Sequence, residues 1–534
     1  MTETEKIETQ KRKATRNYQL ALASAVIFLI FAGWQMWKVN EANKRTQKEQ
    51  QRAEELIHAI PFYEDKFALA NKDGFFYFIN KNGDIVEKLG RWEKAENFST
   101  NYEGLSKVTD KDGSIYLLDT LSHRFKYSNN LNMSDNSIQI LDLRSQNLTE
   151  FPNKIEKLTN LTELWLANNN ITILPDEIEK LTNLAKLDLF NNHITELPKN
   201  IGKLTNLTEL NLSSNEITSV PDEIGNLNNL INLNLSGNEI TSLPDEIGNL
   251  TNLTVLDLSG DLITILPDQI GNLTHLTKLD AARNKITSLP DKIGNLTRLT
   301  KLDVSGNKIA NLPNSIGNLT NLTNLDLSNN AIVDIPNGIG NLNRLTRLDF
   351  SDNMIKSLPD GIGNLKDLKE LFLFHNKVSK LPKEIGNLTK LCWLWLSDNE
   401  INKLPDEFCK LTKLTELELS GNEISDLPDE IGKLKNLSML HLYSNQISEL
   451  PAEIGNLTEL TELDLSNTQI VDLPAETGNL RNLTWLNVSN TNITSLPAEL
   501  KKLANLRIIY HRGTPLDSVS IAMVEKINKV QKHN

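Results

Sequence analysis

The side chains with the clearest chemical potential are carboxylates that recur ten residues before members of a regularly spaced proline series. Neighbouring like charges at this spacing could bind a cation or a basic partner. The surrounding L-D-L-S pattern is equally common as filler in repeated sequence, so both interpretations stay open. The members of this column are Asp188, Asp257, Asp280, Asp303, Asp326 and Asp349.

No catalytic motif accompanies these carboxylates. The chain contains no phosphate-loop pattern, G-x-G-x-x-G, H-E-x-x-H or G-x-S-x-G, and its eight histidines are dispersed. His375 and His441 are the histidines we expect on the same surface. They stand three repeats apart, about 15 Å along a sheet, which is too far to share a metal. The sequence therefore predicts no enzyme, no metal site and no cofactor.

Aromatic side chains form a sharper candidate site. Most residues that flank the recurring leucines are small or polar, and clusters of rings stand out against them. Exposed aromatics on a rigid sheet are typical of interaction hot spots, although rings can also merely strengthen an exposed strand. The predicted partner-binding residues are Phe372, Phe374, Trp393, Trp395, His441, Tyr443, Trp165 and Phe190. Met439 lies near His441 and Tyr443, and Trp485 is isolated.

A repeat of 23 residues, marked by sixteen prolines from Pro152 to Pro497, positions all of these side chains. Such a period predicts a stack of identical units, none of which buries its apolar face alone. Leucine stands eleven residues before and six residues after each of these prolines. The L-x-L alternation predicts a short strand with one buried face. The repeat proline and the acidic residues after it suit the first turn of a helix. The glycine that follows in twelve units should keep that helix short.

An asparagine stands six residues before the proline in twelve units, and its amide can both donate and accept hydrogen bonds. We expect these residues to form a ladder that satisfies backbone groups where each coil turns inward. Asp261 replaces Asn in repeat six and cannot donate when ionised, and Ala281 replaces the usual Leu in repeat seven, so these repeats are predicted to be the weakest. The ladder residues are Asn169, Asn192, Asn215, Asn238, Asn284, Asn307, Asn330, Asn353, Asn376, Asn399, Asn422 and Asn445.

The pattern L-x-x-L-x-L-x-x-N-x-I-x-x-L-P resembles the leucine-rich repeat family from Ile138 to about Pro515. Its L-P-x-x-I-G-x-L variant is similar to the subgroup of plant Ras-group-related proteins, scribble-like scaffolds and many bacterial proteins. The resemblance implies an α/β solenoid, a curved horseshoe with a parallel sheet on its concave side. It also implies binding of a protein or peptide partner. A net charge of −13 argues against nucleic acid as that partner.

The N-terminal segments predict a membrane anchor. Residues 1–17 form a basic tail and residues 18–37 an apolar span long enough for a transmembrane helix. The alternative is a cleaved signal peptide, for which Ile30-Phe31-Ala32 is a poor site. Basic residues flank both sides of the span, and the short tail favours repeats outside the cytoplasm of a bacterium, in the periplasm or at the cell surface. Alternatives are an anchored cytoplasmic scaffold or signalling adaptor of opposite topology, and an enzyme-associated effector such as a repeat-fused ligase.

The remaining segments flank the repeats. Residues 38–60 are predicted to be a helical or flexible stalk, and residues 61–130 a β-rich segment with hairpins at Asp73-Gly74 and Asp112-Gly113. That segment resembles short β repeats named for a Trp-Gly pair, although the pair itself is absent; the alternative is a cap on the first repeat. Residues 131–514 hold sixteen full repeats and a partial one. Residues 515–534 are predicted to be a capping helix, with Thr514 as its N-cap and with Leu516, Val519, Met523, Ile527 and Val530 on one face. Cys392 and Cys409 predict no disulfide framework.

Overall fold

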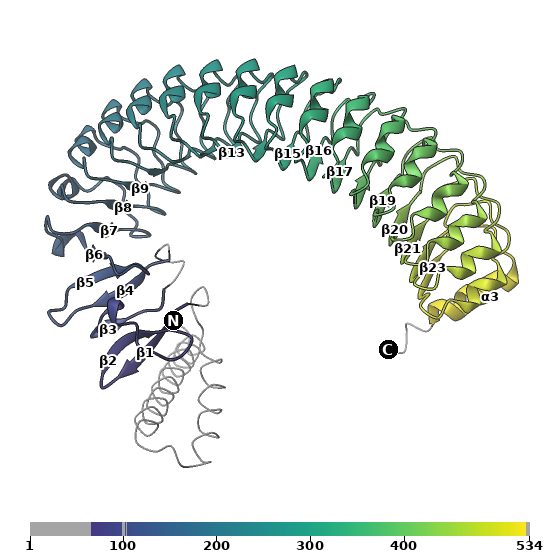
Figure 1. Ribbon diagram of the computed structural model, residues 1–534, viewed down its shortest axis with the longest axis horizontal. Coiled ribbons are helices and arrows are strands. Elements are labelled where there is room, and N and C mark those ends of the chain that lie inside the picture. The colour runs from purple at the N-terminus through teal and green to yellow at the C-terminus, as the bar shows by residue number, and fades with distance from the viewer. Residues whose placement is uncertain (1–65, 99–101, 103, 530–534) are drawn as a thin grey trace, which may run out of the picture. The chain divides into compact units, whose positions relative to one another are not determined.

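The computed structural model describes residues 66–98, 102 and 104–529 (Figure 1). These residues divide into two compact units. Unit 1 comprises the described residues up to Arg144 together with Pro152–Leu166, and unit 2 comprises Ser145–Phe151 and the residues from Ala167 onward. The predicted tail, transmembrane helix and stalk lie outside the described residues. Within the described part of the chain, no helix is both long and apolar enough to cross a membrane.

Unit 1 begins with antiparallel hairpins. Strands β1 (Ala68–Lys72) and β2 (Phe75–Ile79) pair across the two-residue turn Asp73-Gly74, in which both residues have positive φ, as a type I′ turn requires. Strands β3 (Lys94–Ala95), β4 (Ser106–Thr109), β5 (Ile115–Leu118) and β6 (Arg124–Ser128) form a second antiparallel sheet. Phe78, Leu89, Trp92, Phe98, Val108 and Leu118 are the buried core between them.

The second sheet of unit 1 changes from antiparallel to parallel pairing at β6. Strand β6 pairs in parallel with β7 (Ile140–Asp142), and β7 pairs in parallel with β8 (Glu163–Trp165). The hairpins therefore continue the first repeat strand and leave it no free backbone edge on that side, as a solenoid cap must. The short 3-10 helices of this unit are η1 (Glu87–Leu89), η3 (Leu131–Met133) and η4 (Asn153–Lys157).

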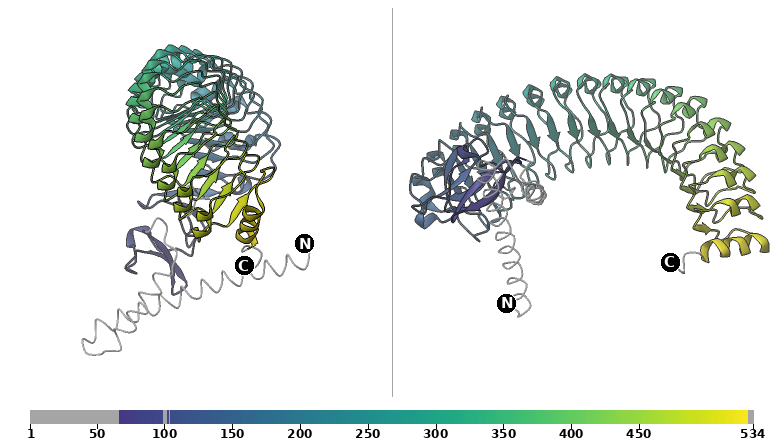
Figure 2. Two further views of the ribbon diagram at one scale, coloured as in Figure 1. Left: turned by 90° about the vertical axis from the view of Figure 1, so that its right-hand side faces the viewer. Right: turned by 60° about the horizontal axis from the view of Figure 1, so that its bottom comes forward.

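Unit 2 carries one long parallel sheet of three-residue strands along the inner side of an arc (Figures 1 and 2). Consecutive strands pair in the same register, so equivalent residues of successive repeats lie side by side. The strands are β9 (Lys186–Asp188), β10 (Glu209–Asn211), β11 (Asn232–Asn234), β12 (Val255–Asp257), β13 (Lys278–Asp280), β14 (Lys301–Asp303), β15 (Asn324–Asp326), β16 (Arg347–Asp349), β17 (Glu370–Phe372), β18 (Trp393–Trp395), β19 (Glu416–Glu418), β20 (Met439–His441), β21 (Glu462–Asp464), β22 (Trp485–Asn487) and β23 (Ile508–Tyr510).

Five-residue 3-10 helices occupy the outer side of the arc (Figure 1). Each follows a repeat proline, which precedes the helix and has an extended ψ; the proline is therefore not its first residue. The helices are η5 (Asp176–Lys180), η6 (Lys199–Lys203), η7 (Asp222–Asn226), η8 (Asp245–Asn249), η9 (Asp268–Asn272), η10 (Asp291–Asn295), η11 (Asn314–Asn318), η12 (Asn337–Asn341), η13 (Asp360–Asn364), η14 (Lys383–Asn387), η15 (Asp406–Lys410), η16 (Asp429–Lys433), η17 (Ala452–Asn456), η18 (Ala475–Asn479) and η19 (Ala498–Lys502).

The glycine at the fourth position of most of these helices does not serve to keep the helix short, as the sequence predicted. A Cβ on Gly363 would lie 2.5 Å from the carbonyl oxygen of Glu384, and a Cβ on Gly202 would lie 2.3 Å from that of Glu223. Glycine is thus needed because the next coil approaches closely, and not because the helix must end. This close stacking lets the leucines and isoleucines of successive coils form one continuous buried core.

Asparagine amides connect neighbouring coils. In Asn376, Oδ1 accepts from the Ile355 amide of the preceding coil at 2.9 Å, and Nδ2 donates to the carbonyls of Phe350 and Leu373 at 2.9 and 3.1 Å. The other ladder asparagines from Asn215 onward repeat this pattern, with the accepting carbonyl 26 residues earlier in the chain. Each amide therefore holds two successive coils in register.

The C-terminal helix α3 (Ser518–Lys529) closes the stack. Asn528 both donates to and accepts from the backbone of Ile509 at 3.0 and 2.9 Å, so its amide occupies the place of a further strand beside β23. The predicted N-cap was wrong, and the predicted helix face was right for Leu516 and Met523, which are buried, but wrong for Val519. Thr514 donates to the Val488 carbonyl at the next ladder position, Asp517 accepts from the Ser520 amide, and Val519 is 66% exposed.

Candidate concave binding site

The candidate site lies on the outward positions of the unit 2 sheet. In most strands the first and third residues lie on the concave surface, whereas the central leucine is buried. Because all strands pair in register, these outward residues form two columns that run along the arc. Side chains 23 residues apart in sequence are therefore direct neighbours.

Three aromatic rings meet on β17 and β18 and on the residues that follow β17. The Phe372 and Trp395 rings are in edge contact with centroids 5.1 Å apart, and the Phe374 ring lies 6.2 Å from Trp395. Trp393, on the other outward column, is 36% exposed. The structure therefore brings the predicted aromatic group together on one surface, with Trp393 as its most exposed ring.

Two of the predicted partner-binding residues are not available at the surface. Phe372 is only 4% exposed because the Arg347 guanidinium lies 4.5 Å over its ring and Trp395 packs against its edge. Trp165 in unit 1 is 2% exposed beneath Arg144 and belongs to a core cluster with Tyr127. Sequence reasoning placed both residues on the correct face of their strands but could not see the long cationic side chains that cover them.

The structure reveals a second aromatic group at the C-terminal end of the sheet. Trp485 is not isolated, because its ring lies 6.3 Å from that of His441 and 5.7 Å from that of Tyr510. Tyr510 was missed, although it stands three repeat lengths after His441 and could have been found by extending the register beyond Pro497. Tyr443 and Phe190 are exposed as predicted, and Phe190 lies in unit 2 whereas Trp165 lies in unit 1.

His441 is held between carboxylates of the two flanking coils. Its Nδ1 lies 2.7 Å from Glu418 Oε2, and its Nε2 lies 3.7 Å from Glu462 Oε2. Burial alone would lower the pKa of this imidazole, but the hydrogen bond and charge of Glu418, together with Asp464 and Glu462, raise the pKa above its usual value.

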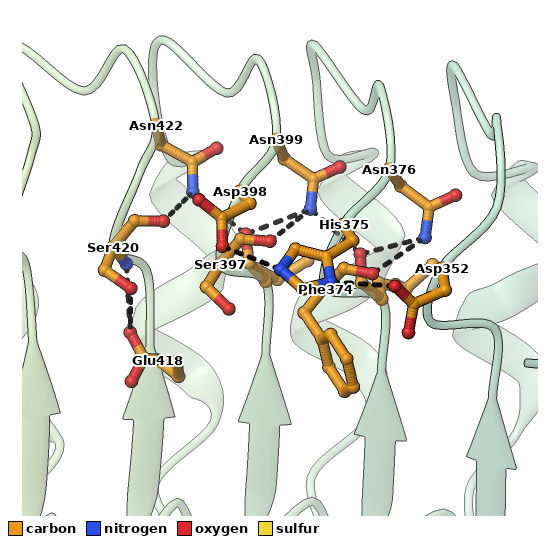
Figure 3. A network of polar contacts seen from close by, with 12 residues as sticks. Asp352, Phe374, His375, Asn376, Ser397, Asp398, Asn399, Glu418, Ser420 and Asn422 are labelled. Carbon is orange, nitrogen blue, oxygen red and sulfur yellow. Dashed lines mark hydrogen bonds and ion pairs between the residues drawn. The ribbon is translucent and has the colours of Figure 1, made fainter. Parts of the chain in front are cut away.

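A second histidine bridges three turns beside the aromatic group (Figure 3). His375 Nδ1 lies 2.8 Å from Asp352, and Nε2 lies 3.1 Å from Asp398. All three residues have φ near +54°, in a column otherwise occupied mainly by Asn, Gly and Ser. The ladder residues Asn376, Asn399 and Asn422 form a row beside them (Figure 3). The two histidines serve separate carboxylate pairs, and the described residues contain no group of side chains suited to a metal.

The aspartate column has a structural role at the ends of the strands. Asp257, Asp303, Asp326 and Asp349 each accept from both the amide and the hydroxyl of the serine two residues later. Burial raises the pKa of Asp280 and Asp326, and the neighbouring aspartates of the column raise it further. Lys278 pairs with Asp257 and Asp280 at 3.7 and 3.6 Å, so basic residues offset part of this charge.

The balance of charge changes further along the arc. We call the outward side chains of β18–β22 the C-terminal strip; none of them is Lys or Arg. The strip consists of Trp393, Trp395, Glu416, Glu418, Met439, His441, Glu462, Asp464, Trp485 and Asn487. A shallow groove of about 730 Å³ follows the residues that precede these strands, and its lining includes Cys392, Thr415, Ser438 and Thr461. Cys392 and Cys409 are both free thiols.

Family models of leucine-rich repeats match almost the whole repeat array. The model described as "Leucine-rich repeat region" matches residues 187–256, 223–307, 302–377 and 371–442. Those described as "Leucine Rich repeats (2 copies)" and "Leucine rich repeat" match residues 435–476, 130–194 and 458–516. The chain belongs to the leucine-rich repeat family. A search of the curated proteins found no match.

Solved leucine-rich repeat structures resemble this chain over most of its length. A leucine-rich repeat protein of Leptospira interrogans is 38% identical with a TM-score of 0.64, covering 76% of this chain and 98% of that one. The plant peptide hormone receptor RGFR1, solved with RGF2, is 29% identical with a TM-score of 0.63, covering 77% and 72%. The functional domain of InlJ from Listeria monocytogenes is 27% identical with a TM-score of 0.55, covering 68% and 76%.

Proposed function

We propose that this leucine-rich repeat protein binds a protein or peptide partner on its concave sheet. The observation that carries the proposal is the cluster of Phe374, Trp393 and Trp395 on a rigid surface whose other outward residues are mostly small or charged. Large rings on a preformed surface lose little conformational freedom when they are covered, which is why they dominate binding energies. His441 and Tyr443 extend this surface, and Phe190 provides a separate contact. Similarity to a receptor solved with its peptide ligand supports the same role.

A selection experiment tests this role. Peptides from a random phage-displayed library are selected on the full chain, immobilised in mild detergent, and their affinities are measured for wild type and for the triple variant Phe374→Ser, Trp393→Ser, Trp395→Ser. We expect the triple variant to bind at least about 30-fold more weakly, which corresponds to about 2 kcal/mol. Ile231→Ser removes an exposed apolar side chain that does not lie on the strands, and it should leave affinity unchanged.

The proposed binding role of this surface would be contradicted if every selected peptide bound the triple variant as tightly as it bound the wild-type protein. Phe372 and Trp165 are left intact because they are buried, and their replacement would confuse unfolding with loss of binding. Thermal unfolding of each variant must therefore be measured alongside its affinity.

The proposed setting is a bacterial membrane, with residues 18–37 as the anchor and the repeats outside the cytoplasm. The length and apolar character of this segment support an uncleaved span. If residues 18–37 are an uncleaved anchor, the intact protein should stay in the membrane fraction after a carbonate wash. Recovery of a soluble form that begins near Gly33 would overturn this prediction. Cleavage of the repeats by protease added to cells with a permeabilised outer membrane would support this topology over an anchored cytoplasmic scaffold.

A further inference from the structure

The C-terminal strip carries an excess of negative charge. Glu416, Glu418 and Glu462 are accessible on β19 and β21, whereas Asp464 is buried and accepts from the Ser466 amide and hydroxyl. No lysine or arginine occupies an outward position from β18 to β22. Two glutamates elsewhere on the sheet have basic partners: Glu370 lies 2.8 Å from Arg347, and Glu209 lies 3.3 Å from Lys186. His441 is the strip's only side chain able to become cationic, and it is shared between Glu418 and Glu462.

Aromatic side chains bound this charged region on both sides. Trp393 and Trp395 lie on β18, before the first acidic strand, and Trp485 lies on β22, after the second. A tryptophan face attracts a guanidinium or ammonium group, most strongly for arginine. Carboxylates flanked by aromatic rings therefore complement the cationic side chains of a partner in both charge and shape.

The spacing of the acidic strands limits the conformation of such a partner. β19 and β21 are separated by two strand intervals, about 9.6 Å. An extended polyproline-type chain advances about 9.3 Å in three residues and returns to the same face after three residues. Two cationic side chains three positions apart would thus reach the acids of β19 and β21 together.

We propose that the C-terminal strip binds an extended basic peptide segment with Arg or Lys at positions three residues apart, running across the strands from β18 to β22. This proposal rests on the proposed function, because it identifies the chemistry of the partner for the same concave sheet. The acids of β19 and β21 receive the two cationic side chains, and Trp393 and Trp485 cover the ends of the segment.

Synthetic peptides and a charge-matched variant pair test the proposal. The probe is a fluorescein-labelled proline- and alanine-rich peptide with two arginines three positions apart; control peptides place them two apart or replace both with glutamate. On the full chain, Glu416→Gln with Glu462→Gln should weaken binding of the probe at least about tenfold. Glu209→Gln with Glu370→Gln changes the net charge equally, but these carboxylates already have basic partners, so affinity should stay within about twofold.

The results separate this inference from the proposed function. Equal binding of the two arginine spacings, or equal weakening by both variant pairs, would show attraction to overall charge and would overturn the assigned site. If the peptides selected from the phage library lack basic residues yet lose affinity in the Phe374, Trp393 and Trp395 variant, the concave site stands and the basic partner is wrong. Enrichment of Arg or Lys at a three-residue interval, lost in the Glu416 and Glu462 variant, supports both.

Discussion

Asp261 shows how one residue can depart from a repeated hydrogen-bonding scheme at a cost. Its side chain is 3% exposed, and Oδ1 accepts from the Ile240 amide at 3.1 Å, as a ladder asparagine would. Oδ2 has no hydrogen-bond partner. Burial raises the pKa of Asp261 to about 7, against the opposing effect of the Ile240 and Asn238 amides. The carboxyl group can therefore remain protonated in the folded chain where it would ionise in the unfolded one.

We predict that Asp261→Asn stabilises the protein increasingly as pH rises. The folded pKa of about 7 exceeds the ordinary value of 3.8, so wild-type stability is retained below 3.8 and lost progressively as pH rises through 7. Each pKa unit corresponds to about 1.4 kcal/mol, so the gain should reach a few kcal/mol above neutrality. Denaturant unfolding at pH 5 and pH 8 measures it. A gain that is equal at the two pH values, or a loss at both, would show that the buried carboxylate is not the cause.

His441 should give a pH dependence of the same sign, in which stability is lost as pH rises. Its raised pKa means that the protonated imidazole stabilises the folded protein below the unfolded value of 6.5, and that this contribution disappears as pH rises through the folded pKa. His441→Gln keeps a polar side chain but cannot take up the proton. We expect wild type to exceed the variant in unfolding free energy by more at pH 5.5 than at pH 8.5. The His375→Gln variant, with a more exposed ring, is the comparison. A pH-independent difference for His441→Gln would argue that packing alone is lost.

At the scale of the element, the 3-10 helices depend on the close approach of neighbouring coils. We predict that Gly363→Ala destabilises the protein by about 1–3 kcal/mol, because its Cβ would meet backbone of the next coil, which cannot move aside cheaply. Glu179 occupies the same position of an earlier coil and already has a Cβ there, so Glu179→Ala should be nearly neutral. Urea unfolding of both variants checks this. If both variants were near neutral, the next coil would be shown to accommodate a Cβ at this position.

Across the whole molecule, stability should vary along the unit 2 stack. In a linear array each coil contacts only its neighbours, so a weak coil opens locally. Asp261 lacks a partner for one oxygen, and Ala281 fills a position otherwise held by larger apolar residues. We predict that amide hydrogen exchange is faster for residues 255–286 than for residues 370–401, and that Asp261→Asn reduces the difference. Uniform exchange along the array would show that cooperativity spreads such defects evenly.

Local periodicity determined most of this fold. A leucine every 23 residues must be buried by the neighbouring coil, and an asparagine at a fixed offset must find the same backbone groups each time, so the strands, their register and the ladder followed from the sequence. The same register placed Phe374, Trp393 and Trp395 on one surface. The 3-10 geometry and the need for glycine did not follow, because they arise from the distance between coils.

Only the tertiary structure decided which outward residues are accessible and which charges remain uncompensated. Arg347 and Arg144 cover Phe372 and Trp165 because flexible cationic stems fold over aromatic rings, and no repeat pattern specifies where such a stem comes to rest. In the same way, Trp485 contacts His441 across the intervening strand β21 and Tyr510 on the adjacent strand β23. Periodicity specifies the face on which a side chain lies, whereas the contacts between neighbouring side chains decide what that face offers a partner.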